Sequence, residues 1–188
     1  LNRLAQINLN QKNYNTSLNY YRKLEKKSKN NRERIDSYIG SLTNYYYLKN
    51  YDSVHFYSSQ INSFNKISFN NRNKINLLSA KSFLDSGDIT KGIDKLLTTI
   101  NLVNDESAAE ANYLLAKVFY SQSQKNQALE TLYALNENFS NYDYWVGKSY
   151  LLIADIFISM NEGFQANATL ESLIDNTDID EIRIKALE

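Results

Sequence analysis

Proton transfer near neutral pH would depend on His55, because it is the only histidine in the chain. No HExxH spacing surrounds His55, and no cysteine is present to supply a thiolate nucleophile or a sulfur-ligated metal. The five glycines form neither a GxGxxG pattern nor a phosphate-binding loop. A lone histidine on a helix is far more often structural than catalytic, so the sequence predicts a protein without enzymatic activity, cofactor or metal.

A cluster of acidic residues near the C-terminal end is the other candidate for a chemical site. Its members are Asp175, Asp178, Asp180 and Glu181. A calcium-binding loop needs ligands at alternate positions, a central glycine and a closing glutamate, and Asp178 and Asp180 supply only a fragment of that spacing. Acidic residues are favoured at the start of a helix by the helix dipole. The cluster therefore predicts the start of a helix rather than a metal site.

The elements that carry these residues follow from a spacing of twelve residues that recurs five times. The pairs are Ala5 and Ser17, Leu42 and Val54, Ala80 and Gly92, Ala116 and Ala128, and Ala154 and Ala166. In four of the five pairs the second member is Ser, Gly or Ala, and the pairs advance in steps of 37, 38, 36 and 38 residues. A fixed period in the range of roughly 20–50 residues is the signature of a solenoid of stacked repeats.

Small residues at this spacing suit two helices that cross closely after a tight turn. The residues four after each second member, which share a face of the second helix, are Tyr21, Ser58, Leu96, Leu132 and Leu170. Turn-forming residues fall between the two helices, at Asn13, Asn50, Gly87 and Asp88, 123–126 and 161–163. No alternating strand pattern competes with this interpretation.

The sequence therefore predicts an all-α, right-handed superhelical solenoid of about five antiparallel helix pairs plus a partial terminal helix. The predicted repeats cover about residues 1–29, 31–66, 70–104, 106–140 and 143–177, with a partial repeat at 178–188, in one segment (1–188). The first residues are typical of the middle of a helix, and the last residues of the start of a sixth repeat. We therefore expect the chain to be an excerpt of a longer one, whose other parts could hold a signal peptide or lipid anchor.

These features resemble the tetratricopeptide repeat. Residues 11–24 and 124–135 are similar to the second-helix half of that motif, with a small residue early in the helix and larger ones further along. The predicted repeats are longer than the family's period of about 34 residues, and the chain contains no proline. Other helix-pair solenoids therefore remain an alternative. The resemblance implies protein–protein scaffolding.

Residues 110–132 and 144–176 also resemble repeats of large bacterial tetratricopeptide proteins of the cell envelope. This similarity favours the periplasm or cell envelope over the cytoplasm and leaves the localisation open. No apolar run approaches the roughly 18 residues that span a bilayer, so direct membrane insertion is not expected.

Charge is distributed unevenly along the chain although its net value is zero. Residues 1–80 carry thirteen Lys and Arg against four Asp and Glu, whereas residues 81–188 carry eight against seventeen. One interpretation of this uneven charge is a basic end that binds an acidic partner, or a contact between copies of the chain. The other is that these are ordinary solvated helix surfaces. A nucleic-acid patch would combine cations with aromatics, but Tyr21 belongs to the repeat's packing positions. We therefore expect no nucleic-acid partner.

In a tetratricopeptide-like array the first helix of each pair lines a concave face, and helical spacing selects the side chains that point there. The predicted partner-binding groove contains Ile39, Thr43, Tyr46, Tyr47, Leu77, Lys81, Leu84, Tyr113, Lys117, Tyr120, Leu151, Asp155 and Ile158. Tyrosine combines large contact area with a polar tip, so Tyr46, Tyr113 and Tyr120 are expected to contact a peptide or helix of a partner. Several of these side chains could instead pack between neighbouring repeats. The alternative function is a structural segment that self-associates through its basic and acidic halves.

Overall fold

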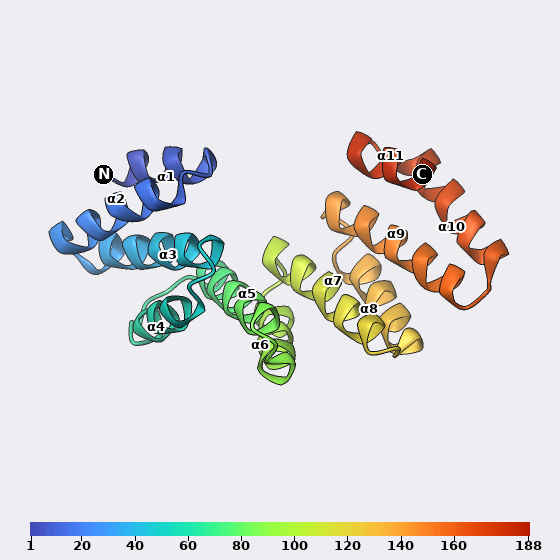
Figure 1. The fold of residues 1–188 in the computed structure, drawn as a ribbon, viewed down its shortest axis with the longest axis horizontal. Helices are drawn as coiled ribbons and strands as arrows, with labels where there is room; N and C mark the ends of the chain where they lie inside the picture. The colour runs from blue at the N-terminus through green and yellow to red at the C-terminus, as the bar shows by residue number, and fades with distance from the viewer. The chain divides into compact units, whose positions relative to one another are not determined.

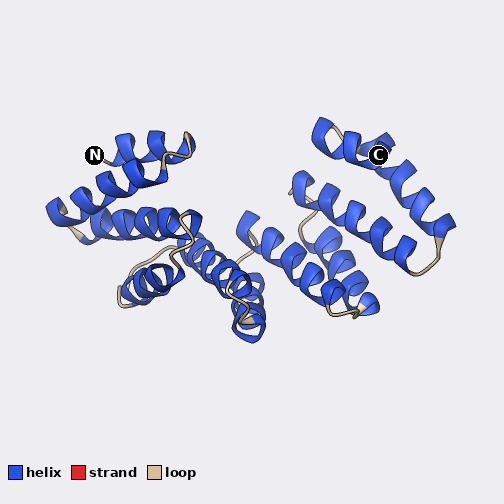
Figure 2. Cartoon of the chain, viewed as in Figure 1, coloured by secondary structure: helices blue, strands red, loops and turns tan.

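The computed structural model describes all 188 residues, and every regular element in it is an α-helix (Figures 1 and 2). The chain divides into two compact units at Thr99, inside the sixth helix. The N-terminal unit contains α1 (Asn2–Asn10), α2 (Tyr14–Lys27), α3 (Asn31–Tyr47), α4 (Tyr51–Asn62), α5 (Phe69–Asp85) and most of α6 (Ile89–Leu102). The C-terminal unit contains the end of α6 and α7 (Glu106–Ser121), α8 (Lys125–Asn138), α9 (Asp143–Ser159), α10 (Gly163–Asn176) and α11 (Asp180–Leu187).

Consecutive helices pack against each other within each unit, and first helices of neighbouring pairs also touch. In the N-terminal unit α2 contacts both α1 and α3, and α3 contacts α4 and α5. In the C-terminal unit α7 contacts α8 and α9, and α9 contacts α10 and α11. The prediction of an all-α chain of sequential antiparallel helix pairs is confirmed (Figure 1). The prediction that the chain is one segment of a longer solenoid stays a prediction.

All ten residues of the twelve-residue pairs are buried, as a close helix crossing requires. In the first pair the Ser17 hydroxyl donates to the Ala5 carbonyl at 2.8 Å, so the small side chain also ties the two backbones together. Asn44 extends this contact to the next pair, because its amide donates to Ser17 Oγ at 3.0 Å and to the Gly40 carbonyl at 2.8 Å. Both bonds are made by the amide nitrogen, whereas the buried Oδ1 of Asn44 has no hydrogen-bond partner, so only the donor side of the amide is compensated for its desolvation.

The five turns between paired helices share one backbone conformation. The residue seven after the first member of each twelve-residue pair has a positive φ, between 57° and 87°, and these residues are Lys12, Lys49, Gly87, Ser123 and Asn161. The N–H of the following residue donates to the carbonyl five residues earlier, at 2.8 to 2.9 Å in every turn. This bond and the left-handed residue define the Schellman motif that ends a helix. Gly87 alone adopts the conformation without a Cβ penalty.

Glycine also permits a close contact between α2 and α3. A Cβ at Gly40 would lie 2.3 Å from the ring of Tyr21, a distance that no real contact reaches. The Tyr21 side chain is buried, so the ring cannot swing into solvent to make room. Tyr21 occupies the packing position that the sequence predicts four residues after Ser17.

Ser123→Gly is expected to increase the free energy of unfolding by about 1 kcal/mol, because the left-handed conformation disfavours residues with a Cβ by roughly that amount. The neighbouring Gln122 has a φ of −88° and provides the matched control. Gln122→Gly should lower stability by about 0.5–1 kcal/mol, since glycine there adds only unfolded-state entropy. Urea denaturation measures both changes, and stabilisation by both substitutions would contradict the assignment of the turn.

Gly40→Ala is expected to destabilise the protein by about 1–3 kcal/mol through overpacking against Tyr21. Helix propensity alone would give the opposite sign, since alanine is favoured over glycine by about 1 kcal/mol in a helix. The control is Gly163→Ala at the exposed start of α10, where an added Cβ meets nothing within 4 Å. Chemical denaturation decides between the two signs, and a stabilised Gly40→Ala variant would show that α2 and α3 are less closely packed.

Candidate partner-binding site

The thirteen predicted groove residues lie on the first helices α3, α5, α7 and α9, seven in the N-terminal unit and six in the C-terminal unit. Ile39, Thr43 and Leu77 are buried and offer a partner almost no surface. The half-buried ones are Tyr46, Lys81, Leu84, Tyr113, Tyr120 and Leu151, and the exposed ones are Tyr47, Lys117, Asp155 and Ile158. Only the ten half-buried and exposed residues could therefore contact a partner, and four of them lie in the N-terminal unit and six in the C-terminal unit.

In the N-terminal unit the tyrosines gather into a stacked group, which we call the tyrosine cluster and which consists of Tyr14, Tyr46, Tyr47 and Tyr51. Tyr14 stacks on Tyr47 with ring centroids 4.7 Å apart and planes within 10° of parallel. Tyr46 meets Tyr47 edge-on at 5.4 Å and lies 6.5 Å from Tyr51. The Tyr47 side chain remains 48% exposed. Stacking thus holds large aromatic side chains in place while leaving part of their surface available.

Two charged residues of α5 border the tyrosine cluster. The Lys81 ammonium lies 5.3 Å from the centre of the Tyr46 ring, within the range of a cation–π contact. The Tyr51 hydroxyl donates to Asp85 Oδ2 at 3.3 Å. Burial, followed by the nearby Asp85 carboxylate, raises the pKa of Tyr46 well above its ordinary value, so the phenol stays neutral and able to donate. The tyrosine cluster therefore offers aromatic faces beside one charge of each sign.

In the C-terminal unit an aromatic group surrounds a lysine, and we call it the Lys148 cluster. The Lys148 ammonium lies 5.0 Å from the ring centre of Tyr113, 5.4 Å from Tyr144 and 5.5 Å from Trp145. The Trp145 ring is 5.7 Å from Tyr113 and meets Tyr144 edge-on at 5.2 Å. Trp145 also packs on Phe139 and the start of α7, between the fourth and fifth helix pairs. Trp145 thus packs between two helix pairs and also contributes to the aromatic surface around Lys148.

Asp155 lies near two of the predicted tyrosines in the C-terminal unit. The Tyr120 hydroxyl donates to the Asp155 carbonyl at 3.5 Å, a long and weak bond. Burial, and secondarily the Asp155 carboxylate, raise the pKa of Tyr113. The pKa of Asp155 is itself raised by desolvation, although the residue keeps more than a third of its surface exposed. These three predicted residues therefore do come together, at the contact of α7 with α9.

Five cluster members are absent from the predicted groove, and they are Tyr14, Tyr51, Tyr144, Trp145 and Lys148; the bordering Asp85 is absent from it as well. Spacing could have found Lys148, since it stands four residues after Tyr144 and three after Trp145, on one face of a helix. Tyr14 and Tyr51 each begin a second helix. Their contacts depend on where the turn places that helix end, and a pattern confined to first helices misses them.

His55 packs against Phe83 with ring centroids 4.0 Å apart, and its Nε2 lies 3.4 Å from Ser82 Oγ. Ser82 has no exposed surface, and its hydroxyl already donates to the Ser79 carbonyl at 2.8 Å. A substrate cannot reach this hydroxyl, so the pair does not form a nucleophile and base. Desolvation lowers the pKa of His55 and keeps the imidazole neutral.

The structure also bears on metal binding and membrane insertion. No group of three or more His, Asp or Glu side chains is arranged to hold a metal ion. None of the helices has both the length and the apolar character needed to cross a bilayer.

A family model of the tetratricopeptide repeat matches residues 110–142, which include most of α7 and all of α8. The fold of the whole chain is similar to solved tetratricopeptide structures. The C-terminal part of a TPR repeat-containing protein from Cytophaga hutchinsonii superimposes with a TM-score of 0.68, at 16% identity, over 99% of this chain and 70% of that one. MamA gives a TM-score of 0.65 at 14% identity, over 92% of this chain and 87% of its own.

A third similar structure is YrrB, described as a TPR protein with an unusual peptide-binding site. Its TM-score is 0.61 at 11% identity, over 97% of this chain and 88% of that one. No curated protein sequence is significantly similar to the chain. Residues 110–142 thus match the tetratricopeptide repeat, and the chain has the fold of tetratricopeptide repeat proteins.

Replacing His55 by Gln is expected to reduce the loss of stability between pH 7 and pH 5. Because the folded-state pKa of His55 lies below its ordinary value of 6.5, the unfolded chain binds the proton first. The stabilisation is therefore complete above that ordinary value and is lost as pH falls toward the lower, folded-state value. Urea denaturation of both proteins at each pH measures the difference, and an equal loss in the two would contradict the neutral assignment.

Proposed function

We propose that this chain is a non-catalytic scaffold that binds a peptide or helix of a partner protein along its first helices, within a larger bacterial assembly. The observation that carries the proposal is that each compact unit presents a group of partly exposed aromatic side chains with a lysine over their rings. We further propose the periplasm or cell envelope as the site of that assembly, and this rests on the sequence resemblance of residues 110–132 and 144–176 alone.

Tyrosine and tryptophan are the side chains that most often dominate binding energy at protein interfaces. They bury a large area for little loss of rotamer entropy, and rings already stacked on each other lose still less. In the tyrosine cluster, Tyr14 and Tyr47 are ordered by their mutual stack before any partner arrives. This ordering favours tight binding by a modest surface.

The polar groups beside the rings suit a peptide. A peptide backbone carries donors and acceptors along its whole length, and a site for it needs both kinds of partner group. Asp85 supplies an acceptor, while the lysine ammonium groups supply donors. The peptide-binding site named for YrrB, whose fold is similar, supports the same class of ligand for this chain.

Alanine at Tyr46, Tyr113 and Tyr120 together is expected to weaken partner binding by at least about thirtyfold, since truncating one interface hot spot removes about 2 kcal/mol or more. The probe is a set of peptides selected from a displayed library on the native chain and measured by fluorescence polarisation. Circular dichroism checks that the variant keeps its helices.

The matched control replaces Phe56 and Tyr133 by alanine. Both are at least half exposed, and they lie on the second helices α4 and α8 instead of the proposed surface. This variant should bind the selected peptides as the native chain does. Equal affinity of the folded Tyr46, Tyr113 and Tyr120 variant would remove the proposed surface from consideration.

A further inference from the structure

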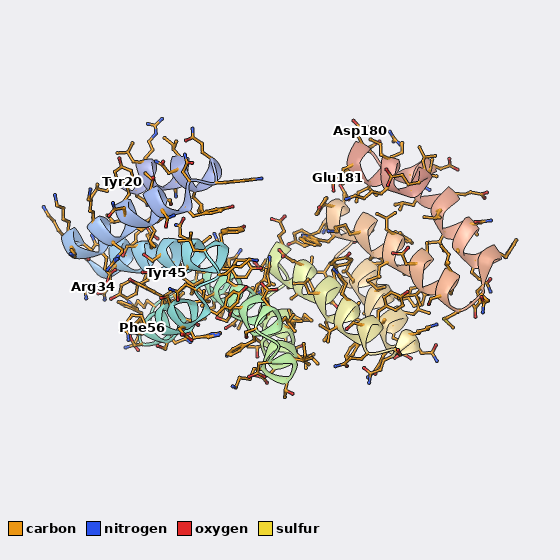
Figure 3. All side chains as sticks on the ribbon, viewed as in Figure 1. Tyr20, Arg34, Tyr45, Phe56, Asp180 and Glu181 are labelled. Carbon is orange, nitrogen blue, oxygen red and sulfur yellow. The ribbon has the colours of Figure 1, made fainter.

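The corner where α2 leads into α3 carries an unusual density of positive charge, and we call residues 22–34 the basic corner. Its seven cations are Arg22, Lys23, Lys26, Lys27, Lys29, Arg32 and Arg34. All seven side chains are exposed, and none lies within 4 Å of a carboxylate. Arg34 is labelled in Figure 3 on the first turn of α3.

The two acids inside the basic corner are already used by the fold. The Glu25 carboxylate accepts a hydrogen bond from the Tyr57 hydroxyl of α4 at 3.1 Å. The Glu33 carboxylate accepts from the backbone N–H of Lys29 at 2.9 Å, and the Glu33 N–H donates to the Asn30 side chain, which together cap α3. Both acids are thus held toward the backbone or a neighbouring helix. The seven cations of the basic corner therefore remain available to an outside partner.

The basic corner also borders a hollow that polar residues, including Asp36, and apolar residues line together. This hollow has a volume of about 910 Å³ and lies between the start of α3 and the loop that joins α4 to α5. Arg32 lines it together with Lys66, and Ile35, Phe64 and Ile67 provide apolar surface. A partner could therefore combine ionic contacts with burial of apolar groups.

The complementary surface is in the C-terminal unit of the same chain. The N-terminal unit has sixteen Lys and Arg against seven Asp and Glu, a net charge of +9, whereas the C-terminal unit has five against fourteen, a net charge of −9. Its densest acidic surface, the acidic corner, surrounds the loop from α10 to α11 and consists of Asp143, Asp175, Asp178, Asp180 and Glu181.

The acidic corner keeps part of its charge unpaired. Asp180 lies 3.6 Å from Arg183, and Glu181 lies 2.6 Å from Lys185. Asp143, Asp175 and Asp178 have no cation within 4 Å. Asp143 and Asp178 line a hollow of about 330 Å³ beside α9. Figure 3 labels Asp180 and Glu181 at the start of α11.

We propose that the basic corner of one copy of this chain binds the acidic corner of a second copy. The two corners occupy corresponding places, each on the loop that follows a second helix, but they belong to different units and carry opposite charge. Such a contact joins two different surfaces, so it can repeat head to tail. The net charge of zero removes the long-range repulsion that usually keeps copies of a protein apart. This inference does not depend on the proposed peptide-binding surface.

Sedimentation velocity at rising protein concentration tests the proposal. It is run in low salt and in 0.5 M salt, where the screening length is about 4–5 Å, on the native chain and on two charge-reversed variants. One is Lys26→Glu with Lys27→Glu, and the other is Asp175→Lys with Asp178→Lys. The native chain should associate in low salt and dissociate in high salt, because exposed charges are screened. Each variant alone should associate at least about tenfold more weakly. An equimolar mixture of the two variants should assemble again, since each then meets an oppositely charged corner.

The matched control is Arg3→Glu with Lys74→Glu, which changes net charge equally at exposed positions outside the basic corner. It should associate more strongly than the basic-corner variant, and circular dichroism verifies that all variants fold. A native chain that stays monomeric in low salt at every concentration overturns the proposal. A mixture of the two variants that fails to assemble also overturns it. Binding of a DNA oligonucleotide to the basic corner, when the chain does not self-associate, would overturn it as well.

Discussion

The close crossing of paired helices is the constraint on which the rest of this structure depends. Each pair meets where two buried residues twelve apart face each other, and in four of the five pairs the second is Ser, Gly or Ala. Short side chains allow the backbones to approach, as the bond from Ser17 to the Ala5 carbonyl shows. Once the crossing is close, the larger residues on the same face, such as Leu96 and Leu132, are buried as well. The core of each pair follows from that one contact.

The turns make this crossing reproducible. A left-handed residue and one backbone hydrogen bond end each first helix at the same distance from the first member of its twelve-residue pair. Four of the five turns accept the strain of a side chain in that conformation, including Lys12 and Lys49. The strain is tolerated because the crossing and the turn determine the same geometry, and moving one would disrupt the other.

The surfaces proposed for binding arise from the same construction. Because the small residues bury one face of each first helix, the side chains on the opposite face are left for contacts between pairs and with solvent. Tyr46 and Tyr47 of the tyrosine cluster and all members of the Lys148 cluster lie on first helices, where their side chains keep part of their surface exposed. The loops that follow second helices lie away from the crossings. They can therefore carry dense charge, as the basic and acidic corners do, without disturbing the core.

The sequence alone determined the helix pairs, because the spacing of small residues is a local pattern that directly reflects a backbone contact. It also located the turns and several side chains of the candidate surface, including Tyr46, Tyr47, Tyr113 and Asp155. The tertiary structure decided which positions on the first helices are covered, since Ile39, Thr43 and Leu77 are buried by neighbouring helices that helical spacing does not describe. It also decided that Tyr14 reaches Tyr47, and that Glu25 and Glu33 are occupied within the fold. Periodicity reports the face of a helix on which a residue lies, whereas its exposure and partners depend on residues tens of positions away that only folding brings into contact.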